Sequence, residues 1–476
     1  MNKDKLRHII FFSHLLIGFI LVYFFKLDYF INPEHNGWDW FWQSLPTKYL
    51  RYDLLKSIWV IHGQPPLHNF LFGIFIKLFY PYHYLMFQIF SVFIGAATTV
   101  LLYDLCDKLI YNIKLKTVLF LIIFFNPAVF LYENYLLYTL NSGFLAVLSV
   151  WIVMRFSETG KNFYIYFLTF IINILILYRS SFHIIFIPAL ICFIYFFMRK
   201  NCKTIIICVL ISFLSIGWCA KNYVLYGFFG TSSWYGLNIY KFITTDFNQE
   251  LRKKVLSGVS IPESVSENNH FYTEDLSKYF IYGFNKKSGF NALNDNNFHN
   301  INIPEISKIH SEAAFKIIKL IPVHYLKNTV KSFILFNQPS FTYDHLNSNR
   351  VKIKGFVDIY ANTVFFDNCL AKKIFNRDIY LVMGILSFAA MTVILLEIIF
   401  FMLREYFRFN RDFKKRGLIL SYMSFIIIYY SLISCLFEIG ENNRFKFLVE
   451  PLIYMLIFYA IEKIIERRLI KKWNYF

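Results

Sequence analysis

Residues 61–69 of this chain read Ile-His-Gly-Gln-Pro-Pro-Leu-His-Asn, and they end a polar, tryptophan-rich loop that follows the first hydrophobic segment. A second polar run, Glu-Asn-Asn-Arg-Phe-Lys at 441–446, precedes the last hydrophobic segment. Polar groups beside lipid are costly to desolvate, so they usually face a water-filled cavity or a ligand. The two runs therefore indicate an integral membrane protein with a working site on one face.

The composition of the chain agrees with a membrane protein. Of 476 residues, 57% are hydrophobic, 21% are aromatic and 17% are charged, whereas soluble domains carry about 25% charged residues. The net charge of +19 could indicate a nucleic-acid partner. We exclude that partner because the basic residues lie mainly in short loops between hydrophobic segments, where they orient a protein in the bilayer.

Hydropathy predicts an all-α polytopic membrane protein with about ten transmembrane helices. We expect these helices at 8–25, 84–104, 116–131, 139–155, 163–178, 183–198, 204–219, 379–402, 417–435 and 448–463. The basic clusters between them then all fall on one side, which the positive-inside rule makes cytoplasmic, with both termini. The first segment is followed by Lys26 and Asp28 rather than a small-residue cleavage site, so we expect it to remain as an anchor.

Residues 65–80 are hydrophobic but are not counted as a span. A full span here would move every later basic loop to the other side of the membrane. This short segment begins with two prolines, and we expect a half-inserted or interfacial helix on the outer face. The predicted organisation has three parts. They are an N-terminal transmembrane module at 1–219 with a first outer catalytic loop at 27–83, an extracytoplasmic segment at 220–378 with amphipathic surface helices, and a C-terminal transmembrane module at 379–476.

One stretch of the extracytoplasmic segment is amphipathic and is interrupted by a proline. It extends from Phe315 to Phe336 with Pro322 near its middle, and we expect it at the outer membrane surface. The low hydrophobicity of 263–300 favours exposed loops rather than a large packed core.

Three motifs occur in order along the chain. A Pro-Pro-Leu helix start at 65–67 closes the acidic first outer loop, Asn-Pro at 126–127 precedes the second outer turn, and a Glu-x-x-Arg-Phe loop at 441–445 comes six residues before a proline. Together they resemble the GT-C superfamily of membrane glycosyltransferases, and among its members the family 39 protein O-mannosyltransferases and the bacterial aminoarabinose lipid A transferases. The resemblance covers most of residues 1–240 and 417–463.

The resemblance implies an inverting transfer of a sugar from a polyprenyl-phosphate donor to a glycan, lipid or protein acceptor at the extracytoplasmic face. It also implies a base or metal ligand in the first outer loop, for which Asp39 matches best, then Asp53, then Glu34. Trp38 and Trp40 flank Asp39, so the paired acid usual in the family is missing. We therefore assign no cofactor with certainty and leave a divalent metal possible.

The candidate site residues are polar groups that this topology gathers on the outer face. Carboxylates can accept a proton, and arginine presents a planar fork to phosphate oxygens. The catalytic candidates are Asp39, Asp53, Glu34 and Glu133. The substrate-binding candidates are His62, Gln64, His68, Arg179, His183, Glu441 and Arg444.

Two other classes of protein remain open. A transporter or flippase of lipid-linked intermediates would favour ionisable groups deep within spans and paired broken helices. A non-catalytic scaffold with a GT-C-like fold is the third interpretation, and the missing acid pair keeps it open. We expect a bacterial plasma membrane as the location, with the endoplasmic reticulum as the alternative.

Overall fold

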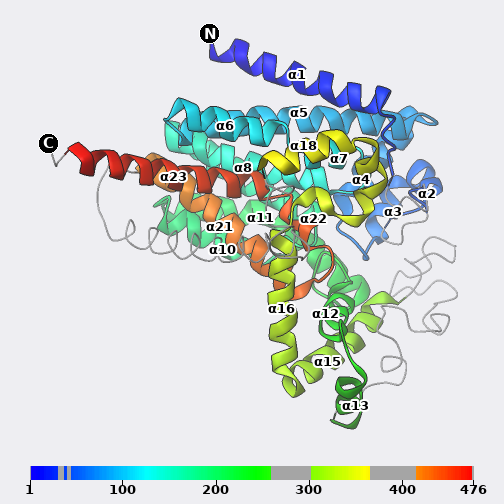
Figure 1. Cartoon of the computed structure of the whole chain (residues 1–476). Coiled ribbons are helices and arrows are strands. Elements are labelled where there is room, and N and C mark those ends of the chain that lie inside the picture. Colours follow the sequence, from blue (N-terminus) through cyan, green and yellow to red (C-terminus); the bar gives the residue numbers. More distant parts are fainter. Residues whose placement is uncertain (1, 31–36, 40–43, 259–301, 365–413, 474–476) are drawn as a thin grey trace.

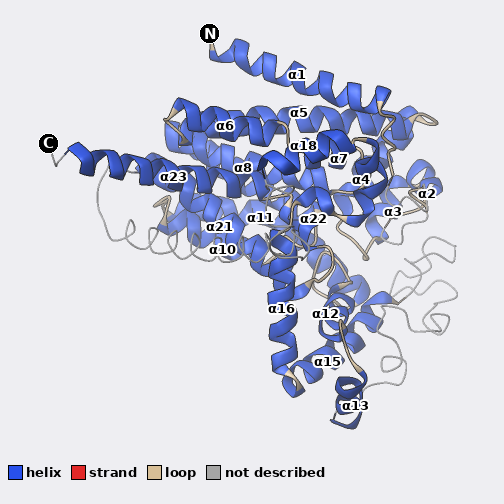
Figure 2. Ribbon diagram, viewed as in Figure 1, coloured by secondary structure: helices blue, strands red, loops and turns tan. Residues whose placement is uncertain are grey.

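The computed structural model describes residues 2–30, 37–39, 44–258, 302–364 and 414–473. Within these ranges the protein is helical, and Figures 1 and 2 show no strand among them. The one extended pairing among them is an isolated bridge between Phe30 and Tyr135. The predicted all-α class is therefore confirmed for the described part of the chain.

In the described part of the chain, six helical segments are long and apolar enough to cross a membrane, and each matches a predicted span. They are Lys3–Phe24 (α1), His83–Leu109 (α5), Ile113–Glu133 (α6 and α7), Thr139–Thr159 (α8), Cys202–Tyr226 (α11) and Lys415–Phe437 (within α21, Lys414–Phe437). The predicted spans 163–178 and 183–198 correspond to shorter apolar helices, Asn162–Tyr178 (α9) and Phe186–Phe196 (α10). The span 448–463 overlaps the first part of α23 (Glu450–Trp473), and 379–402 lies outside the described residues.

The third of these segments is interrupted. α6 (Ile113–Phe124) ends before Asn126, and α7 (Pro127–Glu133) begins directly after it. The Asn126 side chain accepts a hydrogen bond from the backbone N–H of Ala128, and proline is favoured at a first helical position because its missing N–H would have no partner there. The Asn-Pro pair therefore ends one helix and begins the next.

The bundle exposes apolar side chains on the outer faces of its helices. On α11, Ile206, Leu210 and Phe213 are 59%, 60% and 57% exposed, and on α1, Phe12 and Leu16 are both 62% exposed. Spacings of three and four residues put these side chains on one face of each helix. Large apolar surfaces of this kind are unfavourable in water, and they support a bundle surrounded by lipid.

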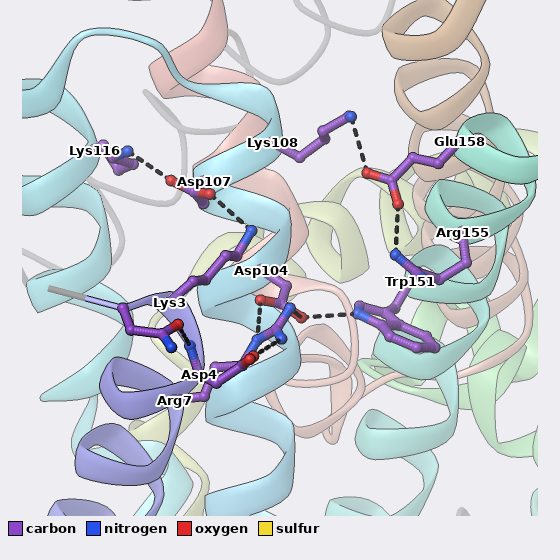
Figure 3. A network of polar contacts seen from close by, with 11 residues as sticks. Lys3, Asp4, Arg7, Asp104, Asp107, Lys108, Lys116, Trp151, Arg155 and Glu158 are labelled. Carbon is purple, nitrogen blue, oxygen red and sulfur yellow. Dashed lines mark hydrogen bonds and ion pairs between the residues drawn. The ribbon is translucent and has the colours of Figure 1, made fainter.

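Charged residues gather at one end of the bundle, where α5 and α8 end and α1 and α6 begin (Figure 3). Asp107 pairs with Lys3 at 2.9 Å and with Lys116 at 2.7 Å. The network consists of Lys3, Asp4, Arg7, Asp104, Asp107, Lys108, Lys116, Trp151, Arg155 and Glu158. Basic loops that the sequence predicts on one side thus meet at one end of the molecule.

The helix expected at 65–80 is α4 (Pro66–Phe79), with 14 residues. Two short helices, α2 (Thr47–Tyr52) and α3 (Leu54–Val60), precede it and pack against it. Gly73 of α4 allows this contact, because a Cβ atom there would lie 2.3 Å from the Leu54 side chain. The structure therefore agrees with a short, separate helix in this position.

Within 220–378, the helices α12 (Tyr235–Thr244), α13 (Gln249–Gly258) and α15 (Ile303–Leu320) share a small core that includes Ile239, Ile243, Ala314 and Ile317. They are followed by α16 (Pro322–Asn337), the short turns Ser340–Thr342 and Asp344–Leu346, α17 (Asn347–Lys352) and α18 (Lys354–Val364). From the end of α16 onward the buried residues, Phe341 and Val357 among them, belong to the core of the main bundle. The predicted break at Pro322 is confirmed. Residues 263–300, expected as loops, lie outside the described residues.

Candidate functional site

Two predicted phosphate ligands, Arg179 and Arg444, lie beside the same aromatic rings. Arg179 follows the last residue of α9, and Arg444 belongs to α22 (Asn442–Lys446). The Tyr138 ring centroid lies 5.2 Å from the Arg179 guanidinium and 5.8 Å from that of Arg444. The Phe445 ring centroid lies 4.5 and 5.5 Å from the same two groups. Residues 265 positions apart in the sequence thus form one cationic site, which we call the arginine pair.

Arg179 is 1% exposed, yet most of its hydrogen-bonding capacity is unused. Its Nε donates to Ser181 Oγ at 3.0 Å, whereas Nη1 and Nη2 have no partner among the described residues. The Tyr430 ring, 5.8 Å away, adds a third aromatic neighbour. Burying a charge without a counterion is unfavourable, and aromatic contacts offset only part of that cost. The two open nitrogens therefore suit an anionic ligand.

Arg444 is 5% exposed and pairs with Glu441, with Nη2 and Oε2 2.6 Å apart. Tyr343 donates to the other Glu441 oxygen at 3.0 Å. Burial lowers the pKa of Arg444 and the Glu441 carboxylate raises it, with a net direction well above the usual value. Burial likewise raises the pKa of Glu441, but the charges of Arg444 and Lys241 outweigh it and leave that pKa low. Both partners are therefore charged at neutral pH.

A second ion pair lies beside the first and was not among the predicted site residues. Lys241 of α12 contacts Glu438 at 3.2 Å, and the charges of Glu441 and Arg444 act on both groups. Burial raises the pKa of Glu438, against the lowering effect of Lys241. Lys241 belongs to an amphipathic helix far from the recognised motifs, so no sequence signal connected it to Glu438.

A small cavity adjoins the arginine pair through Tyr138. The residues that line it are Ser44, Gln64, Pro65, His68, Asn69, Leu137, Tyr138 and Tyr178. The predicted ligand Gln64 is 6% exposed, and its Oε1 has no hydrogen-bond partner within the described ranges. A buried carbonyl oxygen without a partner favours a ligand or water that can donate to it. Of the residues lining the cavity, Gln64 remains the best candidate for such a contact.

His68, also predicted to bind substrate, instead belongs to a chain of hydrogen bonds. Asn141 Nδ2 donates to the Tyr178 hydroxyl at 2.6 Å, and His68 Nδ1 lies 3.1 Å from that hydroxyl. His68 Nε2 lies 3.1 Å from the carbonyl oxygen of Leu136, to which it donates. Burial lowers the pKa of His68 to about 3, so the ring is neutral. Because both ring nitrogens are engaged, His68 shapes the cavity wall rather than binding a ligand.

His62, also predicted to bind substrate, is held by two contacts with Ser233. Its Nδ1 lies 3.2 Å from Ser233 Oγ, and its carbonyl accepts from the backbone N–H of Ser233 at 2.9 Å. The neighbouring Ile61 carbonyl accepts from Lys221 Nζ at 3.1 Å, and Lys221 lies over the Trp218 ring at 3.9 Å. These contacts fix the loop that enters α4 against the end of α11.

The remaining binding candidate, His183, has an exposed side chain in the turn between α9 and α10. Its Nδ1 accepts from the backbone N–H of Ile185 at 3.3 Å, and its own backbone N–H donates to the Tyr429 hydroxyl at 3.0 Å. The histidine thus stabilises the turn that follows Arg179.

The catalytic candidates of the first loop have exposed carboxylates where they are described. Asp39 accepts from the backbone N–H of Thr47 at 2.5 Å and from its hydroxyl at 2.7 Å, which caps the start of α2. Its neighbour Trp38 is fully buried, with its ring 5.3 Å from that of His68 in the cavity wall. Asp53, between α2 and α3, is exposed. Glu34 lies outside the described residues.

Glu133 is fully buried, contrary to its expected place in an outer turn. Its Oε1 lies 2.6 Å from His14 Nε2 of α1, and both residues are 0% exposed. The His14 ring stacks on Phe130 with centroids 5.0 Å apart. The carboxylate therefore joins α7 to α1 inside the bundle, and we no longer include it among the catalytic candidates.

The described residues contain no group of three or more His, Cys, Asp or Glu side chains that could hold a metal ion. Compared with known proteins, the chain matches no family model, no curated protein and no solved structure.

Proposed function

We propose that this protein is an integral membrane glycosyltransferase that takes a sugar from a polyprenyl-phosphate donor and transfers it to an acceptor at the extracytoplasmic face. The observation that carries the proposal is the arginine pair, in which the buried Arg179 has two unpartnered terminal nitrogens among the described residues. Planar guanidinium groups suit phosphate oxygens. The ordered motifs that resemble the GT-C superfamily support the same function.

In the proposed reaction an acceptor hydroxyl oxygen attacks the anomeric carbon of the donor sugar. The bond between that carbon and the phosphate oxygen breaks, and the phosphate leaves with the electron pair. Arg179 and Arg444 would stabilise the negative charge on the leaving phosphate, which is where a fixed cation contributes most to rate. The proton of the acceptor hydroxyl passes to a carboxylate, for which Asp39 is the proposed residue.

The direct test compares lipid-linked sugars and glycoconjugates in cells with and without the protein. If the protein is a transferase, we expect the donor to accumulate and one glycoconjugate to disappear when the protein is removed.

A flippase is the second candidate function, because the buried His14–Glu133 pair is the kind of intramembrane ionisable group that transporters use. A flippase predicts lipid-linked sugars trapped on one leaflet and no transfer by the purified protein, which would overturn the transferase.

The proposed topology has 220–378 and 436–447 outside, and 403–416 and both termini inside. Cysteine labelling of intact cells tests it in a cysteine-free background. We expect an impermeant reagent to modify Glu312→Cys, at an exposed position of α15, and to spare Lys114→Cys, which is exposed at the charged end of the bundle. Asn442 is unsuitable as a probe because it is 0% exposed. Labelling of position 114 instead of 312 would reverse the orientation.

Asp39→Asn should lower sugar transfer by about 10²-fold, the usual contribution of a general base. Because Asp39 also caps α2, Thr47→Val is the matched control, since it removes one capping hydrogen bond and keeps the carboxylate. We expect Thr47→Val and Asp53→Asn to keep most of the activity, measured as transfer per folded protein. Equal losses in Asp39→Asn and Thr47→Val would assign Asp39 a structural role only.

A further inference from the structure

The helix α16 packs against the protein through its polar face. The side chains on that face that hydrogen-bond to carbonyl oxygens of neighbouring elements are His324, Tyr325, Asn328 and Ser332. Asn328 Nδ2 donates to the Phe242 carbonyl at 2.8 Å. Ser332 Oγ donates to the Glu438 carbonyl at 3.0 Å. The polar side of this helix is therefore turned inward.

The opposite side of α16 is apolar and open. Val323, Leu326 and Val330 are 63%, 60% and 49% exposed, and spacings of three and four residues place them on one stripe. Lys327 is exposed beside this stripe. A surface helix of a water-soluble protein shows the reverse arrangement, with its apolar face inward. The inverted pattern indicates that the open side does not face water.

The orientation of α16, and its contact with the end of α21, indicate where this helix lies relative to the membrane. Figure 1 shows α16 running across the direction of α5, α6 and α8. The Tyr325 hydroxyl donates to the Leu436 carbonyl at 3.1 Å, and Leu436 and Glu438 flank Phe437, the last residue of α21. A helix that crosses the bundle direction at the end of a candidate span lies close to parallel with the membrane plane at its surface.

We propose that α16 is a membrane-surface helix whose open stripe contacts the boundary between acyl chains and headgroups, at the end of the bundle where α21 terminates. Val323, Leu326 and Val330 would enter the acyl region of the adjoining leaflet. Lys327 and Lys319, both exposed, would reach lipid phosphates, as lysines of interfacial helices commonly do.

This position has a consequence for the arginine pair, which rests on the proposed function. Lys446 Nζ, two residues after Arg444, donates to the carbonyl of Asn337 at the end of α16 at 3.1 Å. α22, which carries Arg444, packs directly against α16. A surface helix bonded in this way fixes Arg444 near the depth of the headgroups, where the phosphate of a lipid-linked donor lies.

The test is a depth measurement on the full-length protein in lipid vesicles. Leu326→Cys and Val330→Cys, each in a cysteine-free background, are labelled with an environment-sensitive fluorophore. The vesicles contain phosphatidylcholine with a nitroxide at the headgroup, high on the acyl chain, or deep in the bilayer. Glu312→Cys on α15 is the control. We expect the strongest quenching of positions 326 and 330 by the shallow acyl nitroxide, and quenching of position 312 by aqueous iodide alone.

Three results would overturn the proposal. Quenching of position 326 by iodide and by no lipid nitroxide would place the stripe in water. Protection from both quenchers, with crosslinking between two copies of the Leu326→Cys variant, would assign the stripe to a protein–protein contact. Protection without crosslinking would mean that another segment of this chain covers it. None of these readouts depends on activity, so the outcome is separable from that of the proposed transfer reaction.

Discussion

Arg179→Ala should lower sugar transfer from a polyprenyl-phosphate donor by about 10²–10³-fold, which is the usual effect of removing one group that stabilises developing negative charge. Arg179→Lys should recover little, because an ammonium cannot contact two phosphate oxygens in the planar geometry of a guanidinium. The measurement is transfer per folded protein in detergent or vesicles. Arg155→Ala, at the opposite charged end of the bundle, is the matched control, and it should retain full activity.

The melting temperature of Arg179→Ala distinguishes a ligand-binding role of Arg179 from a structural role. Because Nη1 and Nη2 of Arg179 have no partner in the described part of the chain, removing the guanidinium breaks only the contact with Ser181 and the aromatic contacts. We expect the unliganded Arg179→Ala protein to melt at or above the temperature of the parent. Polyprenyl phosphate should raise the melting temperature of the parent and of Arg155→Ala, as a ligand of the folded state does, but not that of Arg179→Ala.

The second variant tested in the same experiment is Arg444→Lys. Lysine is chosen instead of alanine because Arg444 also has a structural partner. Arg444 neutralises Glu441 at 2.6 Å, so Arg444→Ala would leave a half-buried carboxylate without its partner, whereas lysine can keep the ion pair. We expect Arg444→Lys to fold normally and to lose transfer and phosphate-induced stabilisation. If Arg179→Ala and Arg444→Lys both keep parental turnover and parental stabilisation by polyprenyl phosphate, the proposed lipid-phosphate site is wrong.

Local patterns explain which parts of the fold the sequence could predict. The described spans, the short helix after Pro65 and the break at Pro322 follow from hydropathy and proline chemistry within one segment. The charged network at one end of the bundle follows from the distribution of basic loops. The proximity of Arg179 and Arg444, which share the rings of Tyr138 and Phe445, agrees with the prediction that both lie on one face.

Partners distant in the sequence explain which contacts could not be predicted. His68 and His62 have the residue types of a binding site, but the partners that fix their rings, Tyr178 and Ser233, lie 110 and 171 residues away. No motif or local period connects such positions. Lys241 and Glu438 are a further example. Neither belongs to a motif within its own segment, and only tertiary packing brings the two side chains together.

The clearest example is the His14–Glu133 pair, which lies 119 residues apart in the sequence and joins α1 to α7. A Cβ atom at Gly95 of α5 would lie 1.8 Å from Glu133 Oε1, and one at Gly18 of α1 would lie 3.3 Å from Oε2. Two helices thus present glycine where the carboxylate enters. The site is shaped around this side chain, so Glu133 contributes to stability through both its hydrogen bond and its fit.

Breaking this pair should be the most destabilising of the proposed substitutions. Glu133→Ala and His14→Ala each leave one buried polar group without this hydrogen bond, and such changes cost about 1–3 kcal/mol. We expect a lower midpoint of thermal unfolding in detergent for each variant, with Asp53→Ala, an exposed acid, unchanged. The double variant should lose less than the sum of the two single losses, because the removal of both groups leaves no orphaned partner. Strict additivity, or a parental midpoint for Glu133→Ala, would show that the two side chains are not coupled and that α1 is held by its packing on α5 and by the ion pairs of Lys3 and Arg7.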